Sequence, residues 1–209
     1  TMLEWYRTFE DDKAMMRDTE QLVAHVAQTV LGGTLLPGVS RPVDVAPPWE
    51  RLSVEAALQR YAGVALDSVV HDDDRFYRLL IEKVEPELGR GKPTFLTNYP
   101  ARFASLARLS PIDSRFAERF EAYIDGVELC NGFSELIDPV EQRRRLEQDQ
   151  ETREKLGWTV YPIDSRFMAA LEDGVPPSSG NALGFDRLVM SIVGASHIEE
   201  VLAFPVSRV

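Results

Sequence analysis

The chain has 209 residues, of which 44% are hydrophobic and 27% are charged, and 23 basic against 34 acidic side chains give a formal net charge of −11. This composition is that of an ordinary globular protein, so it excludes an intrinsically disordered chain, a collagen-like chain and a disulfide scaffold. The acidic balance argues against broad binding to a phosphate backbone, which requires a basic surface. No apolar run approaches the roughly 18 residues that suggest a membrane span, so we expect no membrane partner.

Cysteine and histidine form no pattern of a zinc site or a disulfide framework in this sequence. Cys130 is the single cysteine, so no internal disulfide can form, and we expect a cytoplasmic protein. The three histidines, His25, His71 and His197, are too far apart in sequence to predict a metal site by spacing. We expect them to be surface or helix-end residues.

The N-terminal half is predicted to begin with a strand. Thr1 to Arg7 alternates and is rich in aromatic residues, which places Glu4 and Tyr6 on one face of that strand. Capping residues, glycines and apolar spacing predict the elements that follow. These are a helix from Asp11 or Asp12 to Leu31, a loop over 32–48, short helices over 53–63 and 72–84, and a buried strand over 94–99.

The strongest hairpin signal lies between Arg119 and Cys130, where Asp125-Gly126 separates two alternating runs. With that turn, Glu121 pairs with Cys130, and Glu121 and Glu128 become diagonal neighbours about 7–8 Å apart at their backbones. Two carboxylates on one sheet face repel each other unless a cation or a donor lies between them. Mg²⁺ on the phosphates of a nucleotide would serve, since it takes one or two carboxylates and phosphate oxygens. The alternative is an ordinary solvent-facing strand surface.

Asn131, Phe133 and Glu135 alternate along the continuation of the second hairpin strand. Their parity differs from that of Glu128, so the strand needs a bulge, and Gly132 is well placed to allow one. An amide, an aromatic ring and a carboxylate side by side could recognise an alkylammonium group. The alternative is that Asn131 and Gly132 are turn residues.

The C-terminal part is predicted as a polar helix over Val140–Leu156, a glycine-rich strand over Gly180–Gly184 and a helix that starts at Phe185. Small residues let a ligand approach a strand closely. Arg187 falls in the first turn of the last helix, where it opposes the helix dipole but reinforces an anion site formed by free backbone N–H groups. A salt bridge to a nearby acid such as Asp186 is the alternative.

These elements predict an α+β fold, a mixed and mostly antiparallel sheet flanked by helices. Three segments resemble the C-terminal half of the catalytic domain of class II lysyl-type aminoacyl-tRNA synthetases, and they are Glu118–Glu121, Glu128–Leu136 and Gly184–Arg187. Thr1–Tyr6 resembles the strand that follows the motif 2 loop of that family, and Lys92–Phe95 and Tyr99–Ala101 also fit. The resemblance covers residues 1–209, with motif 3 at 180–187.

The resemblance implies ATP and Mg²⁺ as cofactors and a lysine-type amino acid as substrate. It implies that Glu121 and Glu128 bind Mg²⁺ and that ATP is bound by Glu128, Leu129, Gly184 and Arg187. Arg187 is the implied catalytic residue and contacts a phosphate. It implies an amino-acid site formed by Glu4, Tyr6, Asn131, Phe133, Glu135 and Ala182. The implied chemistry is attack of the amino acid's carboxylate on the α-phosphate of ATP, with release of pyrophosphate, and catalysis by positioning and charge neutralisation.

Ala182 bears on which branch of the family the chain resembles. Lysyl-tRNA synthetases carry glycine at this place in motif 3, whereas alanine resembles the branch that ligates (R)-β-lysine onto elongation factor P. We favour that branch, with elongation factor P as acceptor. Lysyl-tRNA synthetase, with tRNA as acceptor, is the alternative, and a non-catalytic regulator that binds amino acid or nucleotide is an alternative of another class.

Motifs 1 and 2 of the family have no counterpart in the sequence. We therefore expect a sheet that is incomplete on its N-terminal side, and a fragment that is inactive or nearly so alone. The resemblance further implies that a full-length parent forms a homodimer.

Overall fold

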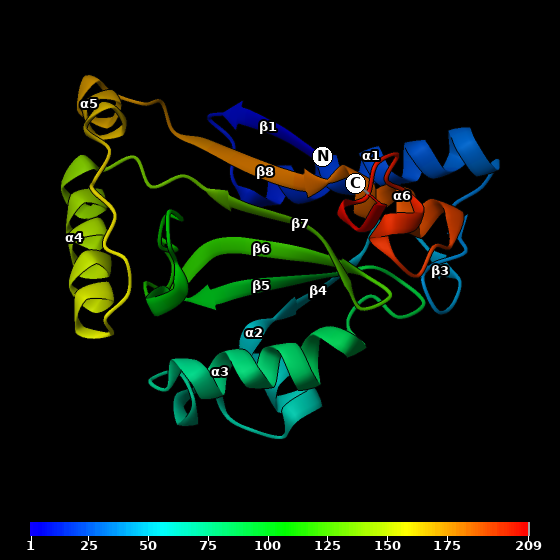
Figure 1. Cartoon of the computed structure of the whole chain (residues 1–209), viewed down its shortest axis with the longest axis horizontal. Coiled ribbons are helices and arrows are strands. Elements are labelled where there is room, and N and C mark those ends of the chain that lie inside the picture. The colour runs from blue at the N-terminus through cyan, green and yellow to red at the C-terminus, as the bar shows by residue number, and fades with distance from the viewer. Residues whose placement is uncertain (209) are drawn as a thin grey trace.

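The structure is a computed structural model that describes residues 1–208, and it is built around one six-stranded sheet (Figure 1). The strands lie in the order β1-β8-β7-β6-β5-β4. Their bounds are β1 Met2–Thr8, β4 Glu50–Ser53, β5 Thr94–Pro100, β6 Phe116–Ile124, β7 Val127–Ser134 and β8 Ser178–Gly184. The β4–β5 pair is parallel and the other neighbours in this sheet are antiparallel, which confirms the predicted α+β class with a mostly antiparallel sheet.

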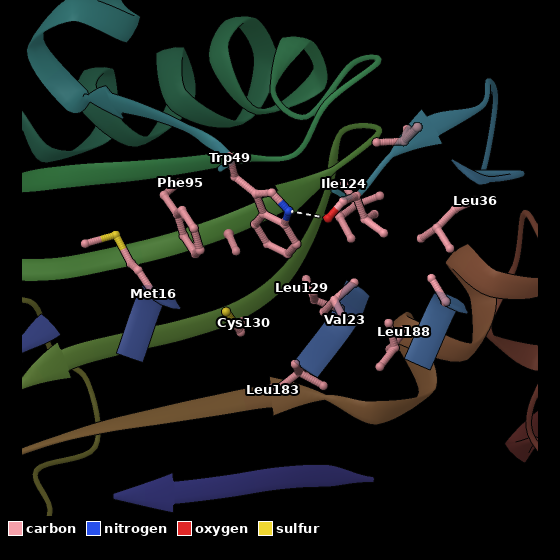
Figure 2. Close-up of a cluster of buried hydrophobic side chains, with 14 of the residues drawn as sticks. Met16, Val23, Leu36, Trp49, Phe95, Ile124, Leu129, Cys130, Leu183 and Leu188 are labelled. Atoms are coloured by element: carbon pink, nitrogen blue, oxygen red, sulfur yellow. Dashed lines mark hydrogen bonds between the residues drawn. The ribbon is translucent and has the colours of Figure 1, made fainter. Parts of the chain in front are cut away.

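One face of the sheet is covered by α1 (Asp12–Leu31) and α6 (Phe185–Val193). The predicted start and stop of α1 are confirmed: the Asp11 side chain accepts from the N–H of Ala14, and Gly32 ends the helix in the left-handed region. The buried cluster between this face and the two helices contains Trp49, whose indole N–H donates to the carbonyl of Val45 at 2.9 Å (Figure 2). The Trp49 ring stacks on Phe95, with their centroids 5.1 Å apart.

The opposite face is covered by helices only over its β4–β5–β6 half. There α2 (Val54–Ala57) continues into a π-helical turn, Leu58–Ala62, and α3 (Asp73–Leu79) continues into another, Leu80–Val84. These helices share a second buried cluster with side chains of β5 and β6, namely Leu96, Tyr99 and Tyr123. In Figure 1 they lie below the β4–β5 edge. The β7, β8 and β1 part of this face carries partly exposed side chains, and the predicted site residues lie there.

Two helices stand at the left end of the sheet in Figure 1, α4 (Pro139–Lys155) and α5 (Ser165–Asp173). The first confirms the predicted polar helix. The second is absent from the sequence prediction, although Asp164 caps its start by accepting from the N–H of Arg166 and it buries Met168 and Leu171. Its apolar residues form one run, Phe167–Leu171, which is too short for a periodicity argument.

The remaining elements are short. The segment predicted as a loop over 32–48 contains a two-residue ladder between β2 (Leu35–Leu36) and β3 (Val43–Asp44), so that prediction is partly wrong. Single 3₁₀ turns complete the described chain at Leu66–Ser68, Glu85–Glu87, Ala101–Phe103, Ile198–Glu200 and Val206–Arg208. Within residues 1–208, no helix combines the length and the apolar character needed to cross a bilayer.

Replacing Trp49 by alanine is expected to lower the free energy of unfolding by about 3–5 kcal/mol, because it empties a packed site in the core. Urea unfolding followed by circular dichroism measures this loss. The matched control is Trp158→Ala, since Trp158 is 60% exposed and its removal should change stability by no more than about 0.5 kcal/mol. Equal losses for the two variants would contradict the placement of Trp49.

Candidate functional site

The hairpin of β6 and β7 forms at the predicted Asp125-Gly126 turn, but its register differs from the prediction beyond Glu128. Cys130 pairs with Ala122 rather than with Glu121, and Glu121 pairs with Asn131. The register shifts between Ala122 and Tyr123, because Leu129 is an extra residue in β7. The predicted pairing of Glu121 with Cys130 is therefore wrong.

The bulge lies at Leu129 rather than at Gly132, so the predicted bulge position is also wrong. Leu129 and Cys130 are consecutive, yet both side chains belong to the cluster under α1. Gly132 has a different reason to be glycine: a Cβ there would lie 2.4 Å from the ring of Phe120. Because Leu129 absorbs the change of parity, Glu128 and Asn131 come to the same side of β7.

The register places six of the predicted site residues, together with Gly180 and Arg119, in two rows across the sheet. The first row runs over β1, β8, β7 and β6 and consists of Glu4, Ala182, Asn131 and Glu121. The second row runs over the same strands and consists of Tyr6, Gly180, Phe133 and Arg119. Residues two apart in a strand share a face, so both rows lie on the face away from α1. The structure thus brings together side chains that are up to about 180 positions apart in sequence.

Glu121 is the most strongly held carboxylate of the site. Its Oε1 accepts from Arg119 Nη2 at 2.7 Å and from Asn131 Nδ2 at 3.3 Å, and its Oε2 accepts from the Tyr123 hydroxyl at 2.7 Å. Burial and the Glu121 charge raise the pKa of Tyr123 well above its ordinary value, so this hydroxyl keeps its proton. The Glu121 carboxylate therefore has one free lone pair, on Oε2.

A third carboxylate, Glu85, lies near Glu121 and Glu128. Burial first, and then the charges of Glu121 and Glu128, raise the pKa of Glu85, while Tyr123 and Arg187 act in the opposite direction. Among the described residues, no group of three or more His, Cys, Asp or Glu side chains has the geometry of a metal site. These carboxylates therefore cannot coordinate a cation by themselves. They fit Mg²⁺ that is also bound by phosphates, because such an ion needs only one or two protein carboxylates.

Arg187 forms a salt bridge to Glu128. The predicted alternative of a salt bridge to a nearby acid is therefore confirmed, although the acid is Glu128 and not Asp186. The Nη1 group of Arg187 donates to the main-chain oxygen of Glu128 at 2.8 Å and to its Oε2 at 3.0 Å. Arg187 is 43% exposed and lies in the first turn of α6, as predicted. Its remaining guanidinium donors are available to an anion in front of the helix.

The amino-acid end of the site combines Tyr6 and Glu135 above Gly180. A Cβ added to Gly180 would lie 2.5 Å from the Tyr6 ring and 3.1 Å from Glu135 Oε1, so glycine lets these two side chains approach β8. Glu135 follows Phe133 by two positions, and its N–H donates to the carbonyl of Ser178 at 2.9 Å. Burial raises the pKa of the Glu135 carboxyl to about 7. A cationic ligand group would offset the cost of burying this charge.

A cavity of about 350 Å³ lies at the Arg187 end of the site, and its lining does not include Tyr6, Glu121 or Glu135. It lies between the Ala182–Asn131 part of the first row, the start of α6 and the 3₁₀ turn at Ile198. The residues that line it include Glu128, Leu129, Asn131, Ala182, Gly184, Arg187 and Ile198. Leu129 lines it although its side chain is 2% exposed and packed in the core.

Four residues of this region were assigned no role by the sequence, and they are Glu85, Arg119, Tyr123 and Ile198. Arg119 and Tyr123 each lie two positions from Glu121 in β6, so their side chains lie on the same face of the strand. This alternation could have identified them from the sequence. Glu85 and Ile198 come from 3₁₀ turns outside the strands and the helix that carry the other site residues, and no local pattern identifies them.

Residues 1–208 match the family of tRNA synthetases class II (D, K and N). The chain belongs to this family. Proteins named elongation factor P–(R)-β-lysine ligase are its relatives: that of Proteus mirabilis (strain HI4320) is 43% identical over 213 residues, and that of Yersinia enterocolitica is 43% identical over 216 residues. That of Klebsiella pneumoniae (strain 342) is 42% identical over 216 residues. Each alignment covers 100% of this chain, and the chain spans 65% of the length of each relative.

Glu135→Gln is expected to make stability less dependent on pH. The folded pKa of about 7 lies above the ordinary value of 4.5, so the wild type loses stability as pH rises through this window. Glutamine cannot ionise, so the variant should match the wild type at pH 4.5 and exceed it by about 1–2 kcal/mol at pH 8, because solvent screens part of the charge of this half-buried carboxylate. Urea unfolding at both pH values measures the difference.

The matched control for this prediction is Glu147→Gln, which makes the same change on the exposed surface of α4. It should leave the pH profile of the wild type unchanged. A Glu135→Gln profile parallel to the wild type would contradict the burial of the Glu135 charge.

Proposed function

We propose that this chain forms the amino-acid-activating site of an ATP-dependent ligase that joins (R)-β-lysine to elongation factor P. The observation that carries this proposal is the first row, which connects Asn131 and Ala182 to the carboxylate Glu121 across one face of the sheet. Glu135 lies on one side of that row, beyond Phe133, and Arg187 lies on the other, beside Glu128. A dibasic amino acid and a nucleotide can therefore meet over it.

The amino-acid side of the proposed site uses Glu135, Tyr6 and Phe133. Glu135 would bind the side-chain ammonium as a charge-assisted partner, and the two rings would cover the methylene groups. Glu4 lies beside Ala182 at the exposed edge strand and would bind a second amino group. An acidic site of this kind favours a ligand with two cationic groups over one with a single charge.

The nucleotide side of the proposed site uses Arg187, Glu128 and Glu121. Arg187 would contact a phosphate from the first turn of α6, with Gly184 leaving room beside it. Glu128 and the free lone pair of Glu121 would hold Mg²⁺ together with the phosphates. When bound, the metal ion neutralises charge on the phosphates and on the leaving pyrophosphate.

In the proposed reaction, a carboxylate oxygen of the amino acid attacks the α-phosphorus of ATP and the bond to the bridging oxygen of pyrophosphate breaks. The products are the aminoacyl adenylate and pyrophosphate. The residues of this chain bind and orient the two substrates and neutralise charge, and none of them forms a covalent bond. Transfer to a lysine amine of elongation factor P would then release AMP.

The family to which the chain belongs is named for tRNA synthetases, so lysyl-tRNA ligation is the second candidate function. The named relatives favour elongation factor P over tRNA as acceptor. A methyl group at Ala182, between Glu4 and Asn131, narrows the floor of the site and favours one placement of the amino group. A homodimer of the complete ligase and a cytoplasmic location belong to the same proposal.

The test is calorimetric binding of L-lysine and (R)-β-lysine to this chain with and without ATP and Mg²⁺, together with amino-acid-dependent exchange of pyrophosphate into ATP. The Proteus mirabilis relative is the positive control for exchange. Tighter binding of (R)-β-lysine, strengthened by ATP, is expected. Tighter binding of L-lysine would favour the tRNA ligase, binding without any effect of ATP would favour a regulator, and no binding of either would contradict the proposal.

Ala182→Gly is expected to shift the ratio of the two dissociation constants toward L-lysine by about 10-fold, since one methyl group in a pocket changes selectivity by about 1–3 kcal/mol. Titration of each amino acid into both proteins measures the ratio. Ala170→Gly, on the exposed surface of α5, is the matched control and should leave the ratio unchanged. An unchanged ratio in Ala182→Gly would contradict the role of this methyl group.

A further inference from the structure

The side chains around Glu121 form a network that the proposed roles do not explain. If Glu121 served only as a ligand for Mg²⁺, most of its lone pairs would be free. Instead Arg119 and Asn131 occupy both lone pairs of Oε1, and Tyr123 occupies one of Oε2. Three of four acceptor positions are thus filled by protein donors.

The two outer members of this network are themselves fixed. Arg119 donates a further hydrogen bond to the carbonyl of Phe103 at 3.0 Å, and its guanidinium lies 4.4 Å from the centre of the Tyr99 ring. Its side chain is 17% exposed, and that of Glu121 is 13% exposed. Tyr123 is 1% exposed and belongs to the buried cluster under α2 and α3. The position of the Glu121 carboxylate is therefore determined by the helix-covered half of the sheet.

This position determines the orientation of the Asn131 amide. A carboxylate accepts hydrogen bonds and cannot donate them, so Asn131 must turn its Nδ2 group toward Glu121. Its Oδ1 is then turned away from Glu121, and this atom is buried without a hydrogen-bond partner. A buried acceptor without a partner costs free energy in the ligand-free protein. Asn131 lines the cavity together with Ala182, and Oδ1 is the polar atom of its side chain that Glu121 leaves free.

We propose that Arg119 and Tyr123 are positioning residues that, by holding Glu121, fix the Asn131 amide with its oxygen free to accept from an ammonium group in the cavity. The identity of the ammonium ligand rests on the proposed function, whereas the fixed amide does not. If the amide were reversed, Nδ2 would take the place of Oδ1 and would repel a cation. The network thus decides whether Asn131 attracts or rejects the ligand.

The first experiment observes the amide directly by selective ¹⁵N labelling of asparagine. The chain has only three asparagines, Asn98, Asn131 and Asn181, so their side-chain N–H pairs are resolved and assigned by substitution. Tyr123→Phe is expected to shift the Asn131 pair alone. Asn181 is the internal control, because its Nδ2 donates to Thr19 Oγ1 on the opposite face of the sheet.

Tyr61→Phe is the matched control variant for this experiment. Tyr61 packs against the same buried cluster as Tyr123 but makes no hydrogen bond to Glu121, so all three pairs should stay in place. An Asn131 pair that does not move in Tyr123→Phe would overturn the proposal. Movement of all three pairs would show a general structural effect and would overturn it as well.

The second experiment is a double-mutant cycle on the binding of (R)-β-lysine or L-lysine, without nucleotide or Mg²⁺. Tyr123→Phe is expected to weaken binding about 3- to 10-fold in the wild-type background, the effect of one lost hydrogen bond. In an Asn131→Ala background the same change should alter binding by less than about 2-fold, because the residue through which it acts is gone. Equal weakening in both backgrounds would overturn the proposal.

The two experiments separate this inference from the proposed function. If the wild type binds neither amino acid, the proposed function fails, and the asparagine resonances decide whether the network fixes the amide. If the wild type binds amino acid but Tyr123→Phe moves neither the Asn131 resonances nor the affinity, the inference fails and the proposed function stands.

Discussion

One extra residue in β7 determines which side chains reach the site. With Leu129 inserted, two consecutive side chains enter the core under α1, and the strand changes parity between Glu128 and Asn131. Without the bulge, either Glu128 or the Asn131–Glu135 series would face the core helix. A charged residue there would have no partner among the apolar side chains of that cluster, so its burial would be costly. The bulge therefore allows Glu128 and the Asn131–Glu135 series to lie on the open face while the other face of β7 stays apolar.

The two faces of the central strands have different roles: the face under α1 contributes to stability, and the open face carries the candidate site. On the α1 side, β8 contributes Leu183 and Asn181, which pack or hydrogen-bond within the core. On the other side, the same strand offers Gly180, Ala182 and Gly184, which leave space above the sheet. Contacts on the α1 side stabilise β8, so the side chains on its open face are not needed for stability. They can therefore be small, which leaves room for a ligand.

Local signals in the sequence were sufficient for most elements and for the presence of the site residues on one face. Asp11, Gly32 and the Asp125-Gly126 turn act through hydrogen bonds and backbone angles that involve only near neighbours, so the ends of α1 and the hairpin turn could be predicted. The bulge position could not, because the choice between Leu129 and Gly132 depends on which side chains of β7 pack under α1, and that packing involves residues distant in sequence. The proximity of Glu85 to Glu121 also depends on tertiary packing, so it could not be predicted from the spacing of these residues in the sequence.

The contact between Phe120 and Gly132 has a consequence for how this protein can vary. Any side chain at Gly132 must displace a ring that is wedged between the sheet and α1, so the two positions can change only together, with a smaller residue replacing the phenylalanine. Glu121 and Asn131 are the chain neighbours of this pair. A substitution at Phe120 or Gly132 would therefore shift the strand backbones that carry Glu121 and Asn131, so a change in the core would alter the site.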